Sequence, residues 1–239
     1  MRTRHPIKFK RIPPKKLQSI RADIVEVLSD AWGEFPEPVL DKHILHSHQI
    51  IIAKLADENI GFCALSKKTL RGIEFIYIEF LVVKPSFQGQ GVGHLLMRKS
   101  LISFILRQWP KHWTINLLFI TPNIQILKKV RKYAKLLYPN PWKQMQKNGA
   151  IAPADKETWE ITKELIAKSE NPKRKLDREA LVLHGSYASA PWLIRNWLKD
   201  NDDELTTRFT EKYLAYGDMQ DRELVVRAQI SPLSLILAL

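Results

Sequence analysis

Three glycines lie close together in the segment Gln88-Gly89-Gln90-Gly91-Val92-Gly93. An apolar run precedes this segment, and apolar residues at helical spacing follow it from His94 onward, so we expect a strand, a loop and a helix. Glycine lets the backbone come close to a ligand, and the unpaired N–H groups of a first helical turn attract anions. The segment therefore predicts a site for a phosphate or pyrophosphate group. A strand–helix turn that binds no ligand is the structural alternative.

The strand predicted before the loop, residues 75–83, contains one charged side chain, Glu79. Both faces of this strand are mostly apolar, which is typical of a central strand covered on both sides. Because side chains alternate along a strand, Glu79 should share a face with Leu81 and Val83. Partial burial would raise its pKa toward neutral pH, which suits a general base. The alternative is a carboxylate satisfied by a nearby lysine or a backbone donor.

Two well-known phosphate-binding motifs do not fit the glycine segment. The Rossmann pattern G-x-G-x-x-G would need a glycine at His94, and no G-K-[ST] follows for a P-loop. The segment does match [QR]-x-x-G-x-[GA], and Val83-Lys84-Pro85 supplies a preceding V-x-P. Together these motifs resemble the acyl-CoA loop of the GNAT N-acetyltransferase superfamily. The resemblance implies acetyl-CoA or another acyl-CoA as cosubstrate, and an amino group of a small molecule, peptide or protein as acceptor.

The resemblance also implies roles for particular residues. In GNAT enzymes the fifth strand splays from the fourth, the pantetheine arm enters the gap, and backbone N–H groups near the end of the fourth strand hold the thioester carbonyl. The residues implied for acyl-CoA binding are Leu81, Val82, Val83, Gln88, Gly89, Gln90, Gly91, Val92, Gly93, His94 and Asn123. Val130 stands where many members have a tyrosine as general acid, so Tyr133 and then Tyr138 are the candidates for that role. Glu79 is the candidate base.

Ahead of the central strand the sequence predicts an edge strand at 5–11, a helix at 16–32 and a loop at 34–38. A β-hairpin is predicted next, with strands at 49–55 and 60–65. A turn at 66–72 then leads into the central strand. His43, His46 and His48 follow the loop without further metal ligands, so we expect solvated or hydrogen-bonded histidines and no metal site. Three antiparallel strands followed by a loop and a helix is the order of a GNAT core.

Beyond the glycine segment the sequence again alternates between strands and helices. The predicted strands are 114–120, 180–183 and 223–230, and the predicted helices are 122–137, 155–169, 192–198 and 204–216. Thr121 is the expected cap of the helix that begins at Pro122. The apolar end, residues 233–239, is a candidate continuation of the last strand.

The length of 239 residues favours a single GNAT-like domain spanning residues 1–239. We expect an α/β (α+β) fold: a central mixed, mostly antiparallel sheet flanked by helices, with a helical C-terminal elaboration. Its core would span about 5–138, the elaboration 139–220 and the last strand 223–230. The elaboration would shape the acceptor pocket. An aromatic wall there could include Trp142, Trp159, Tyr187 and Trp192, with ordinary core packing as their other role.

The chain has a net charge of +13, with basic clusters in residues 1–16, 128–135 and 173–175. Such clusters could bind nucleic acid, but the sequence shows no nucleic-acid module, so we favour attraction of an anionic ligand such as CoA. The one cysteine, Cys63, excludes an intrachain disulfide and suits a buried packing role. No apolar run has the length of a membrane helix and no secretory signal is evident. We therefore expect a cytoplasmic protein that does not enter membranes, with the oligomeric state open and a homodimer included.

Three functions from different classes follow from these features. The first is an acyl-CoA-dependent N-acyltransferase that moves an acetyl group from acetyl-CoA to a primary amine by direct attack. The second is an acyl-CoA-binding module without catalysis, in which the altered tyrosine position reflects lost chemistry. The third is a basic nucleic-acid-binding protein. The sequence favours the first.

Overall fold

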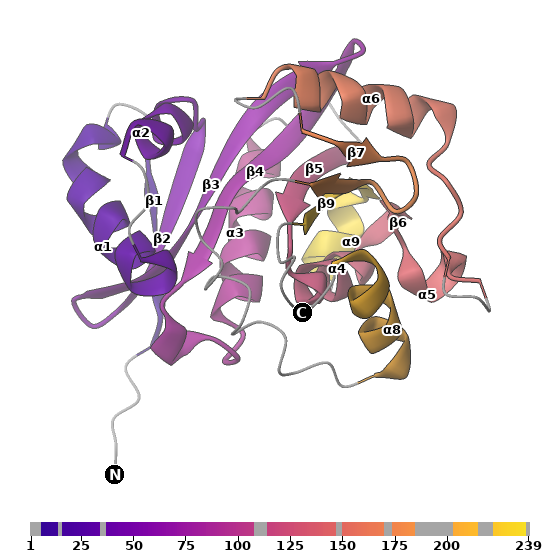
Figure 1. Cartoon of the computed structure of the whole chain (residues 1–239). Coiled ribbons are helices and arrows are strands. Elements are labelled where there is room, and N and C mark those ends of the chain that lie inside the picture. Colours follow the sequence, from indigo (N-terminus) through magenta and orange to yellow (C-terminus); the bar gives the residue numbers. More distant parts are fainter. Residues whose placement is uncertain are drawn as a thin grey trace.

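A nine-stranded sheet forms the centre of the computed structural model, which describes residues 6–13, 16–33, 37–107, 114–146, 150–169, 174–184, 203–214 and 222–237. Within these ranges the strand order is β1-β2-β3-β4-β5-β9-β8-β7, and β6 also pairs with β9. All described pairs are antiparallel except β4 with β5. The mixed, mostly antiparallel sheet flanked by helices confirms the predicted fold class (Figure 1).

The N-terminal half supplies four antiparallel strands and the helices on both of their faces. The strands are β1 (Lys8–Ile12), β2 (Gln49–Leu55), β3 (Glu58–Leu70) and β4 (Ile73–Val83). The helices are η2 (Gln18–Ile20), α1 (Arg21–Trp32), α2 (Glu37–Leu45), η3 (Pro85–Phe87) and α3 (Val92–Leu106). Side chains of α1 and α2 pack on one face of these strands, and side chains of α3 pack on the opposite face. The predicted edge strand and hairpin are confirmed, with β3 longer than expected.

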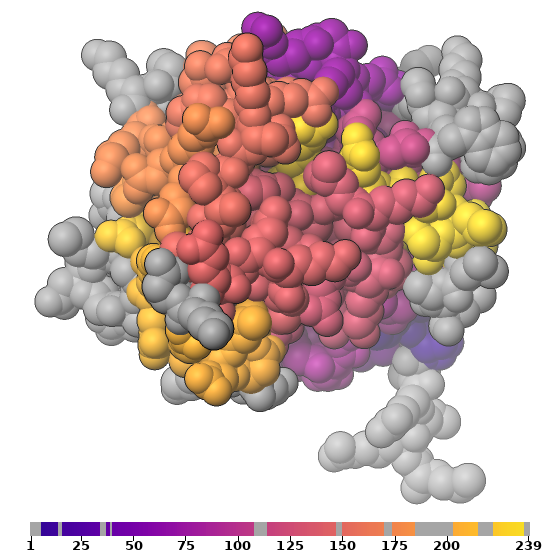
Figure 2. All heavy atoms as spheres, turned by 90° about the vertical axis from the view of Figure 1, so that its right-hand side faces the viewer, coloured from indigo at the N-terminus to yellow at the C-terminus, as the bar shows by residue number. Residues whose placement is uncertain are grey.

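The C-terminal half extends the sheet and adds shorter helices. Its strands are β5 (Ile115–Thr121), β6 (Ala134–Tyr138), β7 (Leu176–Asp177), β8 (Val182–His184) and β9 (Arg222–Ile230). Its helices are α4 (Ile124–Arg131), α5 (Pro141–Gln144), α6 (Lys156–Ala167), α8 (Glu204–Tyr213) and α9 (Pro232–Leu237). Residues of this half make up most of the face seen in Figure 2.

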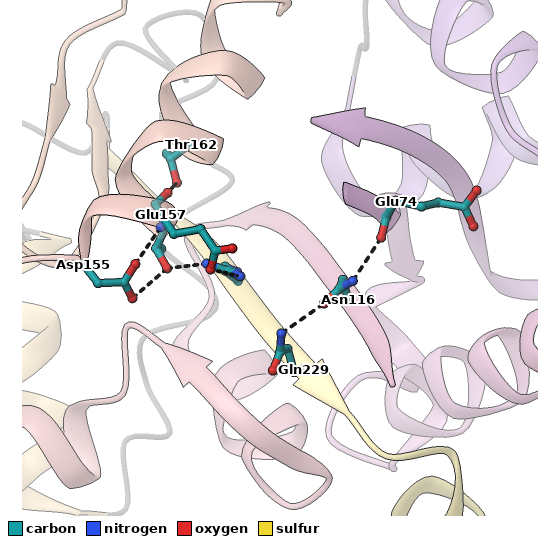
Figure 3. A network of polar contacts seen from close by, with 8 residues as sticks. Glu74, Asn116, Asp155, Glu157, Thr162 and Gln229 are labelled. Atoms are coloured by element: carbon teal, nitrogen blue, oxygen red, sulfur yellow. Dashed lines mark hydrogen bonds and ion pairs between the residues drawn. The ribbon is translucent and has the colours of Figure 1, made fainter. Parts of the chain in front are cut away.

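Polar contacts join the added elements to the central strands (Figure 3). The amide of Asn116 on β5 donates to the carbonyl of Glu74 on β4 and accepts from Gln229 on β9, both at 3.2 Å. Arg227 on β9 is 2% exposed and donates to Glu157 of α6 at 2.7 Å. A buried guanidinium needs such partners, because a desolvated charge without them is strongly destabilising. The bond from Arg227 to Glu157 joins β9 to α6.

The second half departs from the sequence prediction at three points. The helix predicted at 122–137 ends at Arg131, and residues 134–138 form β6 against β9, since strand pairing overrides the local helical spacing. The apolar end forms the helix α9 instead of continuing β9. Asn123, not Thr121, is the N-cap of α4, because its side chain accepts from the N–H of Gln125 at 2.9 Å.

In the first half, α2 is a helix that the sequence analysis did not predict. Its start at Glu37 falls within the predicted loop 34–38, where prolines suggested irregular structure. Proline is accepted in a first helical turn, since the N–H that it lacks has no partner there. Other predicted features, namely the helix 192–198, Tyr187, Trp192 and residues 1–5, lie outside the described residues.

Candidate active site

The central strands β4 and β5 part at the point where the candidate site begins. They pair in parallel over Ile76 to Ile78 and Leu117 to Phe119 only. Beyond these pairs the two strands line opposite walls of a cavity with a volume of about 480 Å³. This is the splay that the GNAT resemblance implied. The β5-facing edge of β4 after Ile78 has no partner on β5, so its backbone groups are available to a ligand.

One end of the cavity is formed by the glycine loop and the start of α3. Gly89 and Gly91 have positive φ angles of 74° and 81°, which glycine adopts without strain. Gly91 is the N-cap of α3, and no side chain caps that end. The amide of Gln88 holds the loop by donating to the carbonyl of Val83 at 2.9 Å. Free N–H groups at the start of a 15-residue helix fit an anion.

Basic and polar side chains from α3 and α4 surround the same end. Lys129 lines the cavity, and together with Lys132 and Arg98 it faces His94. Burial and these three cations lower the pKa of His94 below its ordinary value, so His94 is neutral at pH 7. The hydroxyl of Tyr133 is hydrogen bonded to the His94 ring, and burial raises the pKa of Tyr133. The positive charge at this end suits phosphate groups.

The opposite end holds Glu79, whose side chain is 1% exposed. One carboxylate oxygen accepts from Nδ1 of His43 at 2.6 Å, and the other accepts from Oγ of Ser66 at 2.5 Å. Nζ of Lys68 lies 3.2 Å from that second oxygen. Desolvation alone would raise the pKa of Glu79, but His43, Lys68 and Ser66 outweigh it and lower the pKa below the ordinary value. The expected rise in pKa is therefore wrong, because three donors stabilise the carboxylate.

The predicted direction of the Glu79 side chain is also wrong. Opposite β3, Ala64 pairs with Phe80 and Leu65 pairs with Ile78, so Glu79 is the extra residue of a β-bulge. The bulge breaks the alternation that the sequence suggests. Glu79 bonds to α2, whereas Leu81 and Val83 pack with the cluster on the α3 side. Glu79 still lines the cavity, beside Phe80.

The structure brings most of the predicted site residues together. The cavity is lined by Glu79, Leu81, Val82, Val83, Gln88, Gly89, Gly91, Val92, Gly93, His94 and Asn123. Gln90 and Tyr133 are the predicted site residues that do not line it. Gln90 donates to the carbonyl of Ser86 at 2.9 Å, and Tyr133 is 2% exposed and reaches the cavity only through His94.

Sequence reasoning missed several wall residues and the partners of Glu79. The walls also include Trp32 of α1, Phe80, Phe119 and Lys129. Lys129 belongs to a basic cluster visible in the sequence, but no local signal links Trp32 to β4. His43 was expected only to be solvated or hydrogen bonded, and it is bonded to Glu79.

The described part of the 139–220 segment contributes no residue to this cavity. Trp142 and Trp159 instead pack partly buried against the hydrophobic core. Arg131 lies 4.6 Å from the Trp142 ring centre, and Arg178 lies 6.0 Å from that of Trp159. The aromatic residues that line this cavity are Trp32 of α1, Phe80 of β4, Phe87 of η3 and Phe119 of β5.

Among the described residues, no group of three His, Cys, Asp or Glu side chains is placed to hold a metal ion. No helix within the same ranges is long and apolar enough to cross a membrane.

Comparison with known proteins defines the class to which this fold and site belong. The model of the acetyltransferase (GNAT) family matches residues 17–125, which include β4, the glycine loop, α3 and β5. Residues 17–125, just under half of the chain, therefore carry an acetyltransferase domain of the GNAT family. No curated protein matches the chain.

Solved structures give weaker similarities. A GNAT family acetyltransferase from Streptococcus pneumoniae is 24% identical, with 42% of this chain and 69% of that chain covered and a TM-score of 0.33. A GNAT acetyltransferase from Brucella melitensis in complex with acetyl-CoA is 19% identical, with 47% and 75% covered and a TM-score of 0.37. An IAA acetyltransferase from Bacillus cereus is 14% identical, with 56% and 81% covered and a TM-score of 0.40. At these TM-scores the similarities carry no argument about substrates.

Proposed function

We propose that this protein is an acyl-CoA-dependent N-acyltransferase that moves an acetyl group from acetyl-CoA to a primary amine by direct attack. One observation carries the proposal. One cavity of about 480 Å³ is lined both by the uncapped start of α3 at Gly91 and by Glu79, across the gap between β4 and β5. The uncapped helix start suits the polyphosphate of a thioester donor, which leaves the part of the cavity beside Glu79 for the amine.

The donor would lie along the gap with its pyrophosphate at the glycine loop. Backbone N–H groups of Val92, Gly93 and His94 begin α3, and Lys129 adds a positive side chain. The pantetheine arm would pass between the ends of β4 and β5, with Asn123 beside it. The side-chain oxygen of Asn123 caps α4, so its amide group is the part that would face the arm.

The acyl group would lie against Leu81, Val82 and Val83. Backbone N–H groups on this part of β4 would stabilise the oxyanion that forms when the amine attacks the thioester carbon. The amine must be uncharged to attack and must lose a proton afterwards. Glu79 lines the cavity on β4 several residues before the glycine loop, and His43 is bonded to it, so these two residues form the candidate proton-accepting group.

The acceptor end combines this carboxylate with aromatic walls. The rings of Trp32 and Phe80 lie 5.9 Å apart and are tilted by 49°. Such surfaces favour an amine carried on an apolar or aromatic group. The leaving thiolate needs a proton, and Tyr133, whose raised pKa keeps it protonated, could supply one through His94.

Release of free CoA thiol from acetyl-CoA, measured with a panel of primary amines, tests the proposal. The assay has a low background because the chain's one cysteine, Cys63, is buried and its pKa is raised to about 12. We expect amine-dependent thiol release with at least one apolar or aromatic amine. Acetyl-CoA binding without thiol release for any amine would favour a binding module without catalysis.

A further inference from the structure

Both oxygens of the Glu79 carboxylate are already occupied. Oε2 accepts from His43, and Oε1 lies within 2.5 Å of Ser66 Oγ and 3.2 Å of Lys68 Nζ. Donors of this kind stabilise the charged form and compete with any further proton. With 1% of its side chain exposed, Glu79 also has little contact with water. Its geometry suits holding a neighbour better than exchanging protons itself.

His43 is the neighbour that Glu79 holds. Nδ1 of the ring lies 2.6 Å from the carboxylate, so Nδ1 carries the hydrogen in the neutral ring and Nε2 is left as the acceptor. The His43 side chain is 32% exposed. Because Nδ1 faces buried Glu79, the exposed edge of the ring is the edge that carries Nε2. A carboxylate that fixes an imidazole in this way also stabilises the imidazolium.

The His43 ring does not itself line the cavity, but it contacts two residues that do. His43 contacts Phe80 edge to face, with ring centres 5.4 Å apart and an interplanar angle of 73°. Phe80 and Glu79 both line the cavity, and Phe80 also contacts Trp32. Glu79 and Phe80 therefore position the imidazole and also line the part of the cavity proposed for the acceptor.

We propose that Nε2 of His43, held by Glu79, takes the proton from the acceptor amine, directly or through one water. This inference rests on the proposed acyl transfer. As the amine nitrogen bonds to the acyl carbon, the C–S bond breaks and the thiolate leaves. The nitrogen passes one proton to Nε2, and the imidazolium later returns it to solvent. Glu79 is a positioning residue in this scheme.

Several charged and titratable groups lie near His43. Glu79 on β4 bonds to His43 directly, and Lys68 on β3 bonds to the same carboxylate. Its own helix also carries Lys42 and His46, and His46 Nδ1 lies 2.6 Å from the Lys42 carbonyl. Helix α1 meets α2 through the ion pair between Arg21 and Asp41.

Three variants separate this role from a structural one: His43→Gln, Glu79→Gln, and His46→Gln as a control on the same helix. His43→Gln should lower kcat by about 10²–10⁴-fold and remove the acid limb of the kcat/KM profile, with acetyl-CoA affinity unchanged. Glu79→Gln should also lower kcat with acetyl-CoA affinity unchanged, since the ring is no longer held in the Nδ1–H tautomer. His46→Gln should behave as the wild type.

A ¹⁵N NMR measurement of the His43 ring gives a readout that does not depend on activity. The wild type should show the Nδ1–H tautomer, and Glu79→Gln should show a mixture. A folded His43→Gln protein with wild-type turnover and an unchanged acid limb would overturn the proposal while leaving acyl transfer intact. A wild type that releases no thiol with any amine would overturn the proposed function, and this inference with it.

Discussion

Gly61 on β3 lies opposite Val83, and substituting it tests whether the position of β4 controls the site. A Cβ atom at Gly61 would lie 2.6 Å from the carbonyl oxygen of Val82 and 3.2 Å from Cα of Val83. Real Cβ contacts are hardly ever under 3.0 Å and ordinary contact begins at 3.4 Å, so β4 would have to move by about 0.4–0.8 Å away from Gly61. Forced contacts of this kind destabilise proteins by about 1–3 kcal/mol. For a chain of this length, Gly61→Ala should therefore melt about 2–12 °C lower than the wild type.

The same movement of β4 should also lower the rate of the reaction. A misplacement of about 1 Å at a reacting group can lower a rate by about 10²-fold, so kcat/KM of Gly61→Ala should fall by roughly tenfold. For the melting temperature, Gly93→Ala is the matched control, because its Cβ would meet only Cγ2 of Val83 at an ordinary 3.5 Å. Alanine within a helix stabilises by about 0.5–1 kcal/mol relative to glycine, so this variant should melt at or above the wild type. Equal melting temperatures for Gly61→Ala and the wild type would refute the packing argument.

Three further predictions concern pH, salt and thiol chemistry. The pKa of folded Glu79 lies below 4.5, so its ion pairs stabilise the fold above that pH. The difference in the free energy of unfolding in urea between the wild type and Glu79→Gln should therefore shrink as the pH falls below 4.5. A difference that stays constant with pH would contradict the network of Glu79 and its partners. Acetyl-CoA affinity should weaken with added salt, because exposed charges such as Lys129 are screened over about 8 Å at physiological ionic strength. An affinity that does not depend on salt would mean that local hydrogen bonds provide the recognition. Cys63, with its pKa raised to about 12, should react with thiol reagents at pH 8 only after unfolding, and rapid labelling of the folded protein would show that it is accessible.

The donor side of the site could be predicted from the sequence because its signals are local. The glycine segment, the strand before it and the helix after it lie within about thirty residues, and each has a characteristic pattern. The loop residues and Asn123 consequently line the cavity as expected, apart from Gln90. The side chain of Gln90 folds back onto the loop backbone, which no spacing rule specifies.

The acceptor side could not be predicted because its contacts join distant parts of the chain. His43 and Glu79 are 36 positions apart, and the helix that carries His43 begins in a proline-bearing stretch expected to be a loop. A continuous apolar strand gives no sign of the bulge that turns Glu79 toward α2. The early end of α4 has a similar cause, since Leu137 and Tyr138 pair with β9 nearly a hundred residues later. In each case tertiary contacts override the local pattern.

Calorimetric titration of acetyl-CoA into the wild type, Gly91→Glu and Gly72→Glu tests the central claim most directly. Gly72, in the β3–β4 turn, has a φ of 76° against 81° for Gly91, and a Cβ at either position meets nothing within 4 Å. The two variants therefore carry the same backbone strain and added charge, and only Gly91 lies at the predicted phosphate site. We predict that Gly91→Glu loses acetyl-CoA binding while Gly72→Glu binds as the wild type does. Unchanged affinity in Gly91→Glu would contradict the assignment of the glycine loop and of the cavity behind it.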